Sequence, residues 1–123
     1  MQDFFVLAKA GAWMQITGGA LLGRFGPRVQ KLADQFVAEG WTAVLASDAH
    51  TTNRRAPQLA DAVLRAAALI GKEEADRMVF ERPQAVVNDA APDSVSMPPA
   101  LRPGAQATTG KIRSRVFGWL RKS

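Results

Sequence analysis

The chain has no cysteine, a single histidine and no long apolar run, and each absence excludes a class of protein. Without cysteine, disulfide scaffolds, thiolate zinc sites and thiol nucleophiles are excluded. The one histidine, His50, cannot form a multi-histidine metal cage from this chain alone. No apolar stretch approaches the roughly 18 residues of a transmembrane helix, and the first residues lack the basic region and cleavage site of a signal peptide. We therefore expect a cytoplasmic protein.

Positive charge is present but concentrated at one end of the chain. The 123 residues carry a formal charge of +5. Residues 1–90 hold ten basic and ten acidic residues, whereas residues 91–123 hold six basic residues and one acidic residue. A nucleic-acid-binding domain would carry its basic patch on the folded part. Because that part is neutral, we expect no nucleic-acid partner.

Apolar periodicity predicts alternating helices and strands in residues 1–90. Residues 29, 32, 33, 36 and 37 have the spacing of one helix face. Residues 41–47 (WTAVLAS) form a nearly continuous apolar run, which is typical of a parallel strand covered on both faces. In chain order we predict a helix over 3–10, a strand over 13–17, a glycine-rich loop over 18–26, a helix that begins at Pro27 and is closed by Gly40, a strand over 41–47, a helix over 59–70, and a short helix over 73–80 limited by Pro83.

This order predicts an α/β fold with parallel strands joined by crossover helices. Two parallel strands do not make a stable covered sheet, so either the fold is unusual or the chain is part of a larger fold. A two-strand part of a larger fold would have exposed strand edges and apolar strand faces. Proline, glycine and small polar residues predict a disordered linker over 91–110. Residues 111–123 follow as a basic amphipathic tail, in which Ile112, Val116 and Leu120 share a helical face.

Asp48 and His50 are the first candidates for chemistry. They lie two residues apart at the end of the second predicted strand, and the two-residue period of a strand points both side chains to one side. Sites in parallel α/β folds form at the carboxyl ends of strands, and a carboxylate with an imidazole suits Mn, Fe or Zn. The alternative is a surface turn in which Asp48 caps the next segment.

Two segments about 30 residues apart resemble a known family. The upstream segment is QITGGALLGRFG at 15–26, and the second is LASDAH at 45–50, followed by Arg55 and Pro57. Together with RPQAVV at 82–87, they resemble the C-terminal part of the PHP (polymerase and histidinol phosphatase) family. The most similar group is the bacterial manganese-dependent tyrosine phosphatases of capsule and exopolysaccharide synthesis, the CpsB/CapC type. The resemblance covers roughly residues 3–89.

The resemblance implies a function and a set of site residues. The fold would be a partial (β/α) PHP-type distorted barrel, and the activity hydrolysis of phosphotyrosine on a bacterial tyrosine kinase of polysaccharide export. Asp48 and His50 would be ligands of a multinuclear metal centre, and the metal that the resemblance implies is manganese. Arg55, five residues after the histidine, would hold the substrate phosphate, with Arg54 as a possible substitute. Ala20 stands where the family usually has serine.

The glycine-rich loop leaves two interpretations open. Gly18, Gly19 and Gly23 permit tight turns, and bare backbone N–H groups can also cradle a phosphate. Structural turning is the simpler interpretation.

The remaining metal ligands of the family precede the matched region, and this chain has no counterpart of them. Two ligands cannot build a two- or three-metal site. We therefore expect a truncated phosphatase, with residues 1–90 as its C-terminal portion, that is inactive by itself. The alternative is a non-catalytic remnant or interaction module. In either case the tail at 111–123 could lie on an anionic membrane surface, unless it is a solvated terminus.

Overall fold

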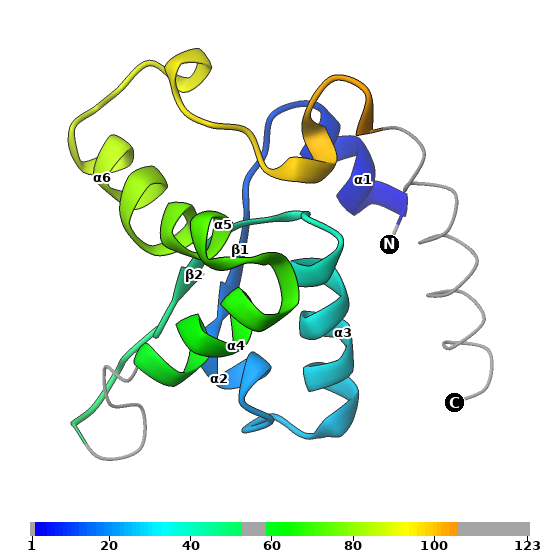
Figure 1. Ribbon diagram of the computed structural model, residues 1–123, viewed down its shortest axis with the longest axis vertical. Coiled ribbons are helices and arrows are strands. Elements are labelled where there is room, and N and C mark those ends of the chain that lie inside the picture. The colour runs from blue at the N-terminus through cyan, green and yellow to red at the C-terminus, as the bar shows by residue number, and fades with distance from the viewer. Residues whose placement is uncertain (1, 53–58, 106–123) are drawn as a thin grey trace.

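The computed structural model describes residues 2–52 and 59–105. Helices and strands alternate through the first half, and helices follow in the second half (Figure 1). The elements are α1 (Gln2–Lys9), β1 (Met14–Thr17), α2 (Gly18–Leu21), α3 (Pro27–Ala38), β2 (Thr42–Ala46), α4 (Ala60–Ile70), α5 (Lys72–Asp76), the π-helical turn η1 (Arg77–Glu81), α6 (Arg82–Val87), and the 3-10 turns η2 (Pro92–Ser94) and η3 (Pro99–Leu101).

The two strands form a parallel sheet, as the sequence predicts. Met14 pairs with Thr42 at one end and Thr17 with Ala46 at the other. The expectation of exposed apolar strand faces is wrong for β2, in which Thr42, Ala43 and Leu45 are buried. Since η1 packs directly on β2, the helices after the sheet supply the cover that the strand pattern could not reveal. In β1, Ile16 is buried and Gln15 is exposed.

Four aromatic rings join α1, α3 and the residue before β2. The ring of Phe4 meets those of Phe5 and Phe36 edge to face, with centroids 5.1 and 5.2 Å apart. Phe5 meets Trp41 in the same way at 4.9 Å. Such pairs add about 0.5–1.5 kcal/mol to the burial of the rings. They fix α1 against the amino end of β2.

The glycine-rich loop predicted over 18–26 begins instead with a helical turn. Residues Gly18 to Leu21 form α2 and are buried. A Cβ on Gly18 would lie 2.9 Å from the Cβ of Ala62 in α4. Glycine is therefore needed here for close helix packing, a requirement that composition alone does not distinguish from a loop.

Pro83 does not end the helical region, contrary to the sequence prediction. The chain continues from α5 through η1 into α6, where Pro83 lies in the first turn. Proline is tolerated in a first turn because its missing N–H would be unsatisfied there in any case. The wider turn of η1 before it separates the two α-helical hydrogen-bond patterns.

Residues 91–105, expected to be part of a disordered linker, pack against the rest of the fold. Ala100 and Leu101 contact the hydrophobic core, and the Ala100 N–H donates to the Gly40 carbonyl oxygen at 3.1 Å. Gly40 has φ 79°, and a Cβ there would lie 2.8 Å from Pro99. The composition is that of a linker, but partners on the body of the fold hold the backbone. Residues 106–110 and the tail at 111–123 lie outside the described residues.

A fully buried arginine fastens this segment to the sheet. Arg82 donates from Nε to the Ser96 carbonyl oxygen at 2.9 Å and from Nη1 to the Ala43 carbonyl oxygen at 3.0 Å. Its Nη2 lies 2.6 Å from a carboxylate oxygen of Glu74, which is also buried. The other oxygen of Glu74 accepts from Arg102 at 3.1 Å. The network connects α5, α6, β2 and residues 96–102.

Candidate metal-binding strand end

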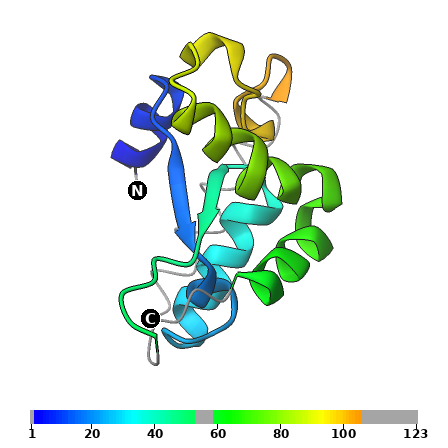
Figure 2. The same cartoon turned by 90° about the vertical axis from the view of Figure 1, so that its left-hand side faces the viewer.

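Asp48 and His50 lie at the carboxyl end of the sheet. Since β1 and β2 are parallel, with Thr17 opposite Ala46, both strands end at the same edge. Figure 2 shows the two strands running toward the end of the molecule that holds α2 and the loop after β2. Ligand sites of parallel α/β folds form at such edges.

Asp48 forms a turn and does not continue the strand. Its φ is 50°, in the left-handed region that aspartate tolerates better than most residues, and β2 ends at Ala46. The expectation that strand periodicity aligns Asp48 and His50 is therefore wrong in its geometry. The turn still brings the two side chains together, with His50 Nδ1 3.9 Å from Asp48 Oδ1.

A short hydrogen bond orients the histidine ring. His50 Nδ1 lies 2.6 Å from the carbonyl oxygen of Asp48. A carbonyl can only accept, so Nδ1 carries the proton and Nε2 holds the lone pair in the neutral ring. Metal-binding histidines are oriented in this way, by donation of the other ring nitrogen to a carbonyl or carboxylate. The arrangement leaves Nε2 as the ring nitrogen whose lone pair is directed away from the Asp48 carbonyl and suits a metal ion.

The donor types fit a divalent transition metal, but their number is small. The side chains of His50 and Asp48 are 59% and 45% exposed, within reach of a solvated ion. A carboxylate oxygen and an imidazole nitrogen suit manganese, iron or zinc. Within residues 2–52 and 59–105, no three His, Cys, Asp or Glu side chains lie together as a metal-binding group. The described residues thus bring together two side chains of metal-donor type and no third.

The predicted phosphate-binding residue, Arg55, lies outside the described residues, as does its neighbour Arg54. Both follow the Asp48–His50 turn along the chain by only a few residues. The role of Arg55 stays a prediction.

Different glycines of the loop have different reasons to be glycine. Gly23 and Gly26 have φ values of 78° and 94°, which confirms the turning role there. Gly19 is instead covered by a neighbouring ring, because a Cβ on it would lie 3.2 Å from Phe25. Ala20 is buried in the core.

A comparison with protein-family models matches residues 1–88 to the family described as capsular polysaccharide synthesis, CpsB/CapC. The match covers most of the chain. This chain belongs to the CpsB/CapC family. No curated protein and no solved structure matches it.

Membership associates this CpsB/CapC chain with capsular polysaccharide synthesis. The match contains the sheet, the Asp48–His50 turn and most of the helices, and it ends at residue 88. In the part of the chain that the structure describes, no helix is both long and apolar enough to cross a membrane.

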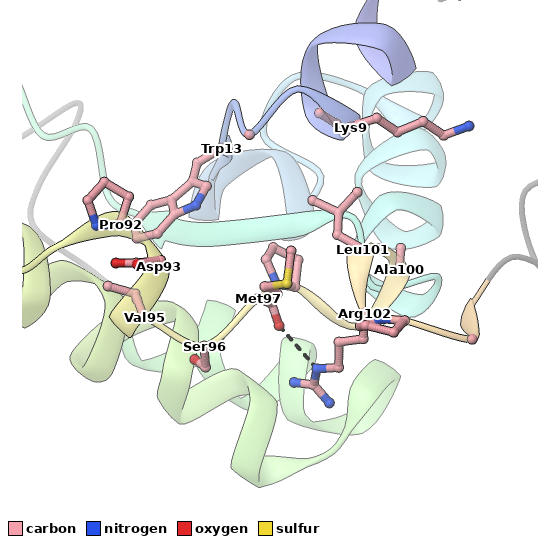
Figure 3. Close-up of a pocket in the computed structure, with 15 residues that line it drawn as sticks. Lys9, Trp13, Pro92, Asp93, Val95, Ser96, Met97, Ala100, Leu101 and Arg102 are labelled. Atoms are coloured by element: carbon pink, nitrogen blue, oxygen red, sulfur yellow. Dashed lines mark hydrogen bonds between the residues drawn. The ribbon is translucent and has the colours of Figure 1, made fainter.

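A groove of about 790 Å³ lies at the opposite, amino end of the sheet of this CpsB/CapC chain. Figure 3 shows Trp13, which precedes β1, on one side and Met97 and Leu101 on another, with Lys9 and Arg102 at its edges. The groove contains neither Asp48 nor His50.

The sequence analysis missed this groove because one of its walls is formed by residues 92–104, which were expected to be disordered. The available signal was weak. Trp13 is 37% exposed, but in the sequence it resembles any other apolar residue at the start of a strand.

Proposed function

We propose that this chain forms part of the active centre of a metal-dependent phosphotyrosine-protein phosphatase that acts in capsular or exopolysaccharide synthesis. The observation that carries the proposal is the Asp48–His50 pair at the carboxyl end of the parallel sheet, with His50 oriented by the Asp48 carbonyl. Family membership supports the process. We further propose that the two strands belong to a PHP-type distorted (β/α) barrel whose other part supplies the missing ligands.

Each site residue has a separate task in this proposal. Asp48 would bind the metal through its carboxylate and His50 through Nε2. Manganese, the ion we propose, would polarise the phosphoryl oxygen and lower the pKa of a bound water. Arg55 would hold two phosphate oxygens with its planar guanidinium. The proposed protein substrate is a tyrosine kinase of polysaccharide export in the cytoplasm.

The test is a chimera that provides the missing part of the centre. The chain is fused behind the N-terminal portion of a CpsB/CapC phosphatase that carries the family's remaining metal ligands, and phosphate release from a phosphotyrosyl peptide is measured with and without Mn²⁺. We expect Mn²⁺-dependent hydrolysis by the chimera and none by the chain alone. The rate should fall by about 100-fold or more in His50→Ala and Arg55→Ala.

Two outcomes would contradict the proposal. One is an active chimera whose rate is unchanged by His50→Ala. The other is a chimera that unfolds cooperatively on heating, and is therefore folded, but hydrolyses no phosphotyrosyl peptide with Mn²⁺ present.

A second candidate is a non-catalytic interaction module. It is favoured by the finding that only two metal donors come together in the described residues. In that case the folded chimera would be inactive, and association through the basic tail would be the remaining activity.

A further inference from the structure

Arg24 and Phe25 form an exposed pair that the functions considered so far do not use. Both side chains lie over Gly19, the second residue of α2. A Cβ on Gly19 would lie 3.2 Å from the Phe25 ring and 3.4 Å from Cδ of Arg24. The Arg24 N–H also donates to the Gly19 carbonyl oxygen at 2.9 Å. Because residue 19 has no side chain, the Phe25 ring and the aliphatic part of Arg24 can pack directly on its backbone.

The packing site on Gly19 lies at the same edge of the sheet as Asp48 and His50. Gly18 follows directly on β1, and a Cβ on it would lie 3.7 Å from the carbonyl oxygen of Ala46, the last residue of β2. Asp48 is two residues further along that strand end. Neighbouring strands are about 4.8 Å apart, so the Arg24–Phe25 pair and the Asp48–His50 pair follow the carboxyl ends of two adjacent strands at one edge of the sheet.

Phe25 remains 47% exposed although Gly19 supports one side of its ring. Arg24 is exposed as well. An aromatic face beside a guanidinium has the chemistry to bind a phosphorylated aromatic side chain, since one ring packs on the other and the cation attracts the phosphate. A phosphoserine has the phosphate but lacks the ring.

We propose that Phe25 and Arg24 bind the phosphotyrosyl side chain, with Phe25 selecting an aromatic over an aliphatic phosphomonoester. The inference rests on the proposed function and adds the residues that determine its specificity. The ring of Phe25 packs against the tyrosyl ring, and Arg24, which follows β1, contributes positive charge to the phosphate.

The test measures binding to the full chain in the presence of Mn²⁺. The probes are a peptide with the non-hydrolysable phosphotyrosine mimic difluorophosphonomethyl-phenylalanine and the same peptide with the corresponding phosphoserine mimic. Phe25→Leu keeps apolar bulk on Gly19 but removes the aromatic face. Arg24→Gln keeps the stem but removes the charge, and Arg24→Lys keeps a charge. Phe80→Leu is the matched control, because Phe80 is 71% exposed in η1 and belongs to a different surface.

We expect Phe25→Leu to weaken the phosphotyrosine mimic about fivefold and to leave the phosphoserine mimic unchanged. Arg24→Gln should weaken both peptides about tenfold, with partial recovery in Arg24→Lys. Phe80→Leu should change neither. Equal effects of Phe25→Leu on both peptides, equal effects of the two phenylalanine variants, or no binding of the phosphotyrosine mimic by the wild type would overturn the inference.

A parallel titration of Mn²⁺, followed by its electron paramagnetic resonance signal, separates this inference from the proposed function. Binding of the phosphotyrosine mimic with the expected pattern, but with no Mn²⁺ bound through His50, supports the recognition surface and contradicts the metal-dependent phosphatase. If Mn²⁺ is bound through His50 but the two peptides bind equally well, the metal site of the proposed function is supported and the recognition role of Phe25 is contradicted.

Discussion

At the scale of single residues, the candidate metal site depends on a contact between the backbone of Asp48 and the side chain of His50. The Asp48 carbonyl oxygen accepts a hydrogen bond from His50 Nδ1 at 2.6 Å, and the backbone of Asp48 is in the left-handed region, with φ 50°. One residue therefore has two tasks. Its backbone orients the imidazole, and its carboxylate is the second donor in the proposed metal site. A substitution at residue 48 can be chosen to remove only the donor.

The first prediction concerns metal affinity. Asp48→Asn and His50→Gln should each weaken Mn²⁺ binding about 10-fold or more, because each removes one of the two donors that lie together. The measurement is the free Mn²⁺ signal in an electron paramagnetic resonance titration of the folded chain. Asp61→Asn, in the first turn of α4, is the control and should leave the affinity unchanged. Equal affinity in all three variants would show that these donors do not bind the ion.

The second prediction concerns the buried arginine. Arg82→Met should lower the free energy of unfolding by about 3 kcal/mol or more, since it leaves the Ala43 and Ser96 carbonyls without their donor and removes one partner of buried Glu74. Urea denaturation measures the change.

Arg65→Met is the matched control for Arg82→Met. Arg65 also holds a carboxylate through two nitrogens, and its hydrogen bond with Asp34 raises the pKa of the Arg65 guanidinium. Its side chain is 40% exposed, so solvent screens the pair and the loss should be about 1 kcal/mol or less. Equal losses at Arg65 and Arg82 would contradict a special role for the buried network.

At the scale of elements, the sequence predicts those parts in which one face of a single segment decides the structure. The stripe on residues 29–37 predicts α3, and the apolar run at 41–47 predicts β2 and its parallel pairing, which the structure confirms. The predictions of a glycine-rich loop at 18–26 and of a disordered linker after residue 90 failed for a different reason. Gly18 is buried against Ala62, and Ser96 is held by Arg82. Both contacts join residues far apart in the sequence, and no local pattern contains them.

The candidate site also has a part that the local sequence predicts and a part that it does not. Asp48 and His50 could be named from the sequence because they directly follow a strand, and the structure does bring them together. The turn that does so could not be predicted from strand periodicity. Aspartate adopts a positive φ more readily than most residues, but most aspartates do not have one, so Asp48 alone does not predict the turn. The Arg24–Phe25 pair depends on a close approach to Gly19 and was equally hidden.

The third prediction tests where the folded unit ends. A chain that stops at residue 105 should unfold at the same temperature as the full chain. A chain that stops at residue 90 should unfold several degrees lower, since it loses the core contacts of Ala100 and Leu101 and the Ser96 acceptor of Arg82. Circular dichroism melts give both values. If the shorter chain is as stable as the longer one, residues 91–105 are a linker after all, as their composition suggests.

At the scale of the whole molecule, charge and chemistry belong to different parts of the chain. The strand-end site lies in residues 1–90, where acidic and basic residues balance. Residues 1–105 remain neutral, with eleven of each sign. The formal charge of +5 therefore arises in residues 106–123. An anionic partner should therefore bind the full chain more tightly than a chain without residues 106–123. The affinity for a metal ion at the strand end should be the same for both chains.

The last prediction follows from this separation. The full chain should sediment with vesicles that contain anionic phosphatidylserine, because Lys111, Arg113, Arg115, Arg121 and Lys122 are together in the tail and each basic residue contributes about 1 kcal/mol near such a surface. The chain that stops at residue 105 is the matched control, since it keeps the described fold and has no net charge.

Salt dependence decides whether that binding is electrostatic. Because the Debye length falls from about 10 Å at 0.1 M salt to about 3 Å at 1 M, the full chain should leave the vesicles at high salt. It should also ignore uncharged phosphatidylcholine vesicles. Retention at 1 M salt, equal binding to uncharged vesicles, or equal binding by the chain that stops at residue 105 would each show that the positive tail does not place this protein on an anionic membrane.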